Sequence, residues 1–227
     1  MALPIPDRSA AGRELAALLG HYRDRDDVIV LALPRGGVPV AAEIAEALEA
    51  PLDVLIVRKL GVPGHRELAM GAIASGGVRV LNDDVVRMHG ITQQELEAVA
   101  REEEAELARR ERTYRGERPF PDLRGRSVIL VDDGLATGAT MMAAVDAVRA
   151  QEPARVVVAV PVAPPETIAR LRQKVDEVVC PYQPEPFFAI GQWYVDFSQT
   201  SDEEVKTILS HHHARRPPAT AGQEKPA

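Results

Sequence analysis

The chain has 227 residues, of which 27% are charged and 45% are hydrophobic, a balance typical of globular proteins. This length is enough for one sizeable domain with a small appendage. Lys and Arg total 27 against 34 Asp and Glu, giving a formal net charge of −7. The balance disfavours a general nucleic-acid binder, which normally presents a basic face, although a local basic patch stays open.

The cellular setting is also restricted by the sequence. No apolar run approaches the roughly 20 residues that span a bilayer, and the N-terminus shows no signal-peptide pattern. The single cysteine, Cys180, excludes an intrachain disulfide framework and suits a reducing compartment. We therefore expect a cytoplasmic protein that has neither membrane nor nucleic acid as a partner.

The first part of the chain alternates helical and apolar segments. Ser9 is a plausible helix N-cap. The continuous apolar run at 28–33 is typical of a strand buried on both faces. In order, we expect a helix from Ser9 to about residue 21, strands at 28–33 and 52–58, a helix at 38–49 between them, a mobile loop at 59–67, and shorter strands at 68–74 and 78–81 around a hairpin turn.

The middle of the chain predicts a helical insertion over about 82–118. Its long helix, 92–115, begins at Thr92 with Glu95 in capping-box position. Charged residues are expected to mark the solvated face of this helix: Glu102, Glu103, Glu104, Glu106, Arg109, Arg110 and Arg112. The helix could alternatively serve an oligomer interface.

The remaining pattern alternates strands and helices. Strands are expected at 127–133, 154–162 and 175–180, with helices at 137–151 and 165–174 between them. Such alternation implies a parallel sheet with right-handed crossovers. The chain therefore predicts one α/β domain over 1–210, with an appendage at 181–210. Residues 211–227 lack apolar content and are expected to be a disordered tail.

The stretch VILVDDGLATGATM, residues 128–141, carries the main chemical signal. Asp132 and Asp133 end an apolar strand at the sheet edge where α/β proteins bind ligands. The small residues that follow let backbone N–H groups at a helix N-terminus approach a phosphate, and the hydroxyls can add donors. These residues are Gly134, Ala136, Thr137, Gly138, Ala139 and Thr140. The two carboxylates are suited to accept hydrogen bonds from vicinal hydroxyls, so together the features predict a ribose 5-phosphate site.

A paired aspartate can also simply cap the turn that follows a strand. The whole series favours ligand binding, and it resembles the signature of type I phosphoribosyltransferases. That resemblance implies a mostly parallel five-stranded sheet flanked by helices, with a small C-terminal hood. It also implies that Asp132 and Asp133 hold the ribose hydroxyls of 5-phosphoribosyl-1-diphosphate, that 136–140 hold its 5-phosphate, and that Mg²⁺ binds at the aspartate pair.

The resemblance extends to other parts of the chain. The segment LPRGGVPVAAEIA matches the family's diphosphate loop, where Arg35 offers charge and Gly36 and Gly37 can bare their amides. Arg58 and Lys59 are expected at the end of the second strand, facing the same sheet edge and the diphosphate. The segments HRELAMGA and WYVDFSQTSDEEVKTIL also resemble a bacterial and archaeal subgroup of the family.

The implied reaction displaces diphosphate from ribose C1 by a ring nitrogen of a base. Asp132 and Asp133 would stabilise positive charge on the ribose, while Lys59 and the diphosphate loop would stabilise the leaving group. Family members that act on hypoxanthine and guanine carry an aspartate where this chain has Ala136, which weakens an oxopurine assignment. Glu67 is the alternative carboxylate, from the mobile loop.

The acceptor base is the least specified component. Aromatic residues gather in the expected hood, and Phe187 or Trp193 could stack on a base or merely pin the hood to the core. Cys180 is expected to be a buried, unreactive thiol, and His211–His213 a solvated stretch rather than a metal site. A homodimer is expected because many relatives are dimers.

Two further functional hypotheses compete with transfer. A regulator that senses the phosphoribosyl ligand without catalysis stays open, although the acidic balance disfavours nucleic-acid control. A Rossmann dinucleotide site is excluded because PRGGVP is not G-x-G-x-x-G.

Overall fold

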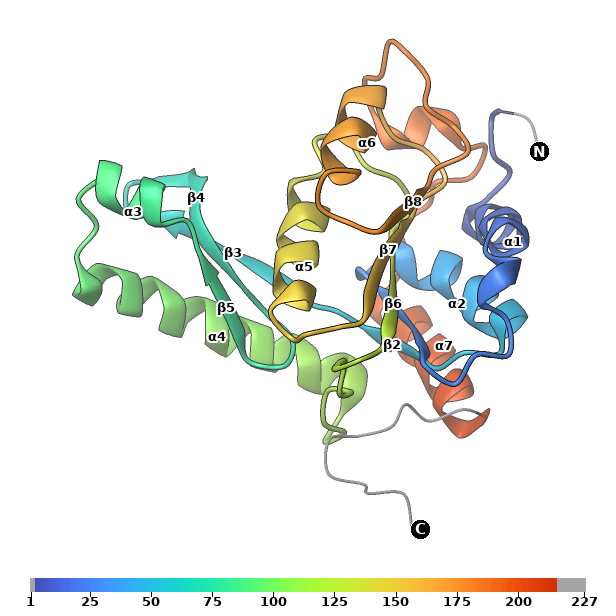
Figure 1. Ribbon diagram of the computed structural model, residues 1–227, viewed down its shortest axis with the longest axis horizontal. Coiled ribbons are helices and arrows are strands. Elements are labelled where there is room, and N and C mark those ends of the chain that lie inside the picture. Colours follow the sequence, from blue (N-terminus) through green and yellow to red (C-terminus); the bar gives the residue numbers. More distant parts are fainter. Residues whose placement is uncertain (1–2, 216–227) are drawn as a thin grey trace.

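The computed structural model describes residues 3–215 (Figure 1). Its centre is a five-stranded sheet in the order β2-β1-β6-β7-β8, in which every neighbouring pair is parallel. The strands are β1 Val28–Ala32, β2 Leu52–Val54, β6 Ser127–Val131, β7 Arg155–Ala159 and β8 Glu177–Val179. The predicted fold class, a parallel five-stranded sheet flanked by helices, is confirmed.

Helices cover both faces of this sheet because its strands are apolar on both sides. On β1, Val28 and Val30 belong to one core cluster and Ile29 and Leu31 to the other, as the alternation of side chains along a strand requires. The first cluster includes side chains from α1 Arg8–Leu18, α2 Gly37–Leu48 and α7 Asp202–Arg215. The second is closed by α5 Ala139–Arg149 and α6 Pro165–Leu171.

A second, antiparallel sheet projects from the central one and forms an arm, residues 57–115 (Figure 1). It consists of β3 Val57–Val62, β4 His65–Ala74 and β5 Val78–Leu81, followed by α3 Asp83–Met88 and α4 Gln93–Arg115. The predicted hairpin between the strands at 68–74 and 78–81 is confirmed.

Two expectations about the start of the arm were wrong. The predicted strand 52–58 is divided between β2 and β3, which belong to different sheets. The segment 59–67 is also not an irregular loop, because it forms the turn of the β3–β4 hairpin and the strand ends on either side of that turn. Gly61 fits within β3 because the pairing register shifts there, and Gly64 has a φ of +79° at the turn.

Helix α4 begins as the sequence indicates. The Thr92 side chain accepts from the Glu95 amide, and the Glu95 carboxylate accepts from the Thr92 amide, which is a complete capping box. Its charged face is only partly solvated. Glu102, Glu104, Arg109 and Arg112 are exposed, whereas Glu103, Glu106 and Arg110 are half-buried.

Both termini of the described chain differ from expectation. Helix α1 is capped by Asp7, whose side chain accepts from the Ala10 amide at 2.7 Å, and not by Ser9. Helix α7 continues to Arg215 and buries His213, so a disordered tail from residue 211 is wrong for 211–215. The rest of that predicted tail, 216–227, lies outside the described residues.

The predicted hood, 181–210, is not one unit in the structure. Its first part pairs with the N-terminal segment through the isolated bridge between Ile5 and Tyr194. This part includes the short 3-10 helix η2 Ile190–Trp193. A similar helix, η1 Gly20–Tyr22, follows α1. Its last part begins α7, which packs against α2, α4 and β2. Across residues 3–215, none of the helices combines the length and the apolar character needed to cross a bilayer.

Candidate functional site

The two aspartates follow β6 directly, at the carboxyl edge of the central sheet. Asp133 is buried, and its Oδ2 accepts from Nε of Arg8 at 2.8 Å. Its backbone carbonyl accepts from the Tyr194 hydroxyl at 2.7 Å. Asp132 is half-buried and its Oδ1 accepts from the Asp133 amide at 2.9 Å. The pair is therefore held by residues from both ends of the chain.

Burial and proximity affect the two carboxyl groups differently. Burial, together with the negative charge of Asp133, raises the pKa of Asp132 well above its ordinary value. Burial also raises the pKa of Asp133, but the hydrogen bond and charge of Arg8 oppose this effect. Neither Arg8 nor Tyr194 was among the predicted site residues. An isolated arginine 125 positions away gives no local sequence signal.

The loop 134–140 leads from the aspartates into α5. Gly138 is the N-cap of α5 with φ of +71° and offers no side chain as a cap, while the Ala139 amide at this helix end donates to the Thr137 hydroxyl at 3.4 Å. Ala136, Thr137, Ala139 and Thr140 are exposed. The amides at a helix N-terminus attract an anion, and binding of the 5-phosphate by this loop stays a prediction.

Helix α6 supports this loop from behind. The Thr167 hydroxyl donates to the Ala136 carbonyl at 2.8 Å, and Arg170 Nη2 donates to the Thr137 carbonyl at 2.7 Å. A Cβ on Gly138 would lie 2.6 Å from Thr167 Cγ2, which explains the glycine there. The sequence did not indicate these roles of Thr167 and Arg170, because helix periodicity alone does not show which loop a helix supports.

The loop Leu33–Gly37 packs against the aspartate pair. A Cβ on Gly36 would lie 1.9 Å from Asp133 Oδ2, and one on Gly37 would lie 2.6 Å from the Val131 carbonyl oxygen. Both glycines are thus required by close approach. The expectation that both amides are bare is wrong for Gly37, whose N–H donates to the Leu33 carbonyl at 3.1 Å.

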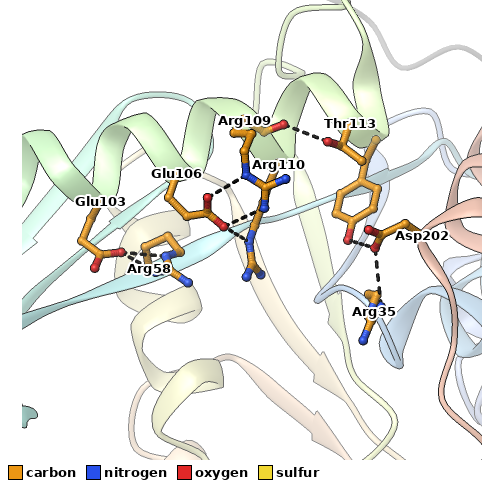
Figure 2. A network of polar contacts seen from close by, with 9 residues as sticks. Arg35, Arg58, Glu103, Glu106, Arg109, Arg110, Thr113 and Asp202 are labelled. Carbon is orange, nitrogen blue, oxygen red and sulfur yellow. Dashed lines mark hydrogen bonds and ion pairs between the residues drawn. The ribbon is translucent and has the colours of Figure 1, made fainter.

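Arg35 points away from this loop toward the start of α7 (Figure 2). Its Nη1 lies 3.7 Å from Oδ1 of Asp202, which also accepts from the Tyr114 hydroxyl at 2.7 Å. Arg35 therefore connects the loop at 33–37 with α7 and, through Tyr114, with α4.

The expectation that Arg58 and Lys59 lie at the end of the second core strand was wrong. Both lie on β3 of the arm rather than at the end of a core strand. Arg58 Nε donates to Glu103 of α4 at 2.7 Å (Figure 2). Glu103 precedes Tyr114 by eleven residues, about 16 Å along the helix. The structure therefore does not bring Arg58 together with Arg35.

Lys59 and Glu67 both line one groove of about 700 Å³. The groove lies between the arm and the first turns of α5, and its lining includes Ala139 of the phosphate loop and Met142. Lys59 and Glu67 of the arm therefore approach the predicted phosphate loop at the start of α5. The lining of this groove includes no residue of the loop at 33–37.

The aromatic segment 187–197 packs against the N-terminal segment. Trp193 is half-buried, with its ring centroid 6.0 Å from that of Phe187, and its buried Nε1 has no hydrogen-bond partner among residues 3–215. Phe197 contacts Tyr194 with 5.0 Å between ring centroids. Stacking of Trp193 or Phe187 on a base stays a prediction.

Cys180 and the histidines were expected to be inactive. Burial raises the pKa of the Cys180 thiol to about 12, so it stays protonated and a weak nucleophile near neutral pH. His213 is buried in α7, so the histidine stretch is not fully solvated as expected. Within residues 3–215, no group of three or more His, Cys, Asp or Glu side chains could hold a metal by itself.

Comparison with known proteins agrees with this arrangement. Residues 3–197 match the model of the phosphoribosyl transferase domain, and the chain belongs to this family. The chain is 52% identical over 207 residues to Rv0571c and MT0597 of Mycobacterium tuberculosis, whose names describe them provisionally as phosphoribosyl transferases. The match covers 91% of this chain but only 46% of those proteins, so the chain spans about half their length.

A solved structure is also similar over nearly its whole length. The crystal structure of TT1426 from Thermus thermophilus superposes with a TM-score of 0.82 at 45% identity. The match covers 91% of this chain and 98% of that one.

Proposed function

We propose that this protein transfers the 5-phosphoribosyl group from 5-phosphoribosyl-1-diphosphate to a ring nitrogen of a nitrogenous base and releases diphosphate. The observation that carries the proposal is the junction of three features at one sheet edge. The aspartate pair, the N-terminus of α5 and the glycine loop at 33–37 all meet there. Together they offer acceptors for two ribose hydroxyls beside an anion site.

The chain's own residues would divide the chemistry as follows. The amides of 136–140 hold the 5-phosphate, with Thr137 and Thr140 adding hydroxyl donors. Asp132 and Asp133 accept from the ribose hydroxyls and stabilise positive charge as the bond from C1 to the diphosphate oxygen breaks. Diphosphate leaves with the bonding electrons, and the base nitrogen forms the new bond to C1 and loses its proton.

The leaving group and the base proton need further groups. Candidates for the diphosphate are the Gly36 amide, Arg35 if it turns away from Asp202, and Lys59 from the groove, whereas Arg58 is paired with Glu103. Ala136 offers no carboxylate, so Glu67, an exposed residue of the groove, is the candidate to accept the base proton.

Mg²⁺ fits this site together with its ligand. This ion commonly binds through one or two carboxylates plus substrate oxygens, and Asp132 and Asp133 offer two. When bound, Mg²⁺ would neutralise charge on the diphosphate.

We include in the proposal a role in nucleotide salvage, a cytoplasmic location and a homodimer. Sedimentation velocity would check the homodimer.

The testing experiment is a calorimetric titration of 5-phosphoribosyl-1-diphosphate with Mg²⁺, followed by diphosphate release with a panel of purine and pyrimidine bases. Release with one base would support the transferase and name its substrate. Tight binding with no release for any base would favour the alternative, a non-catalytic sensor of the phosphoribosyl ligand. An absence of binding would overturn both.

A further inference from the structure

Arg8, near the start of the chain, joins three separate segments at the ligand edge. Its Nε lies 2.8 Å from Oδ2 of Asp133, and both side chains are 11% exposed. Its Nη1 donates to the Ser198 carbonyl at 2.6 Å, and its guanidinium carbon lies 4.1 Å from the centroid of the Phe197 ring. The Arg8 side chain thus links α1, to which it belongs, with Asp133 and with the aromatic segment.

This contact makes the two aspartates unequal. Oδ2 of Asp133 is already committed to Arg8, and a Cβ on Gly36 would overlap with this carboxylate, so little space remains around it. Asp132 as a whole residue is less buried than Asp133, and within residues 3–215 its carboxylate accepts from the Asp133 amide, whereas Arg8 affects it through charge and donates no hydrogen bond to it. Two neighbouring carboxylates with different surroundings can take different roles.

We propose that Arg8 is a positioning residue that fixes the orientation of the Asp133 carboxylate and ties the aromatic segment 187–197, together with the adjoining Ser198, to the ligand edge, leaving Asp132 to make the main contact with the ribose hydroxyls. This inference rests on the proposed function for its ligand. Its structural part, the coupling of Arg8 to Asp133 and to the aromatic segment, does not depend on any ligand.

The fork of the guanidinium explains why arginine stands at this position. Arginine presents several donors in a fixed plane and also stacks on aromatic rings, and Arg8 uses these properties toward Asp133, Ser198 and Phe197. Glutamine would leave a buried carboxylate without its countercharge, which is costly. Lysine would keep the charge but could not keep all three contacts.

Helix α1 offers a matched control. Arg13 lies on the same helix and pairs with Glu43 at 2.9 Å, but its side chain is 58% exposed. Arg8→Gln and Arg13→Gln therefore remove the same charge from the same helix, one inside the site and one outside it. Trp193 is the only tryptophan of the chain and packs, as Phe197 does, against the cluster that contains Tyr194, so its emission reports on the aromatic segment.

The experiment measures affinity for 5-phosphoribosyl-1-diphosphate with Mg²⁺ by calorimetry, and Trp193 emission without ligand. We expect Arg8→Gln to lower the affinity at least tenfold and to shift the emission to longer wavelength. Arg8→Lys should give an affinity and an emission between those of Arg8→Gln and the wild type. Arg13→Gln should change neither quantity. In combination with Asp133→Asn, Arg8→Gln should lower the affinity less than twofold further. Equal affinity of the Arg8→Gln and Arg13→Gln variants, or losses that multiply in the double variant, would overturn the proposal.

Two arms keep the test decisive. If the wild type binds no 5-phosphoribosyl-1-diphosphate, the proposed function fails, and the Arg8–Asp133 coupling is tested by urea unfolding of the two single variants and the double variant. Non-additive shifts in the unfolding midpoint then support the positioning contact, and additive shifts overturn it. If Arg8→Gln does not fold, Arg8→Lys replaces it with Arg13→Lys as control, and equal affinity of those two variants overturns the proposal.

Discussion

At the scale of single residues, Asp132 carries a conflict between stability and function. Its carboxyl is withdrawn from solvent beside Asp133, so the folded protein disfavours its ionised form and its pKa is raised. A carboxyl whose pKa is raised by folding lowers the stability of the folded protein once the pH exceeds the pKa that the group has in the unfolded chain, about 3.9. The same negative charge is what a ribose hydroxyl and a developing cation need.

We therefore predict opposite effects of Asp132→Asn on stability and on binding. The variant should be as stable as the wild type or more stable, by about 1 kcal/mol at pH 7, because the like-charge contact is removed. Its affinity for 5-phosphoribosyl-1-diphosphate with Mg²⁺ should fall at least tenfold. Urea unfolding and calorimetry measure the two effects. A variant with wild-type affinity would contradict the role of Asp132.

Gly138 permits a second residue-scale prediction. Its φ of +71° costs an alanine about 1–2 kcal/mol, and the added Cβ would lie 2.6 Å from Thr167. Gly138→Ala should lose about 2 kcal/mol or more and displace the phosphate loop. Gly125 has a φ of +69°, and a Cβ added there would meet nothing within 4 Å, so Gly125→Ala controls for the backbone penalty alone. Equal losses in urea unfolding and unchanged phosphate binding would contradict the prediction.

At the scale of elements, α4 is linked to α7 by one hydrogen bond at the site's border. Tyr114 is buried on α4, and burial together with Asp202 raises the pKa of its hydroxyl to about 12, so it remains a donor at neutral pH. The accepting Asp202 also lies 3.7 Å from Arg35 (Figure 2). The arm is thus connected to the glycine loop through three side chains, those of Tyr114, Asp202 and Arg35.

Tyr114→Phe should destabilise the protein by about 1 kcal/mol, the usual net value of a hydrogen bond, because Asp202 can turn to water. Thr113→Ala is the matched control, since the Thr113 hydroxyl only donates to the Arg109 carbonyl on an exposed turn of the same helix. It should change stability by less than about 0.5 kcal/mol. Indistinguishable unfolding midpoints of the two variants would refute the prediction.

The elements that could be predicted from the sequence are those with a strong local pattern. Buried parallel strands are continuous apolar runs, so β1, β6 and β7 were predictable, and the capping box marked the start of α4. The β3–β4 hairpin was missed because Gly61, Pro63 and Gly64 are typical of a loop. A register shift at Gly61 allows a strand there instead.

The candidate site shows the same division between local and distant information. The aspartate pair and the phosphate loop are contiguous in the sequence, so their shared position was predictable. Arg8 reaches Asp133 across 125 positions, and Arg58 turns to Glu103 instead of the sheet edge. Such pairings depend on how elements dock, which periodicity and turn residues do not encode.

At the scale of the whole molecule, α7 joins the core to the arm. It begins beyond the matched family region, which ends at residue 197, yet it packs against α2, β2 and α4 (Figure 1). Val205 and Leu209 are fully buried on it. A helix that contacts both parts should unfold together with them and not as a separate tail.

Leu209→Ala should therefore destabilise the entire chain and not only its last helix. Removing a buried leucine side chain costs about 2–5 kcal/mol, a large share of the about 5–15 kcal/mol that stabilises a typical domain. Leu18→Ala provides the control, because Leu18 is 50% exposed on α1 and should cost about 0.5 kcal/mol or less. Circular dichroism and Trp193 emission, followed together in urea, should show one transition that is shifted to lower urea in Leu209→Ala only. Two separate transitions, or a midpoint equal to that of Leu18→Ala, would show that α7 is not part of the cooperative unit that holds the site together.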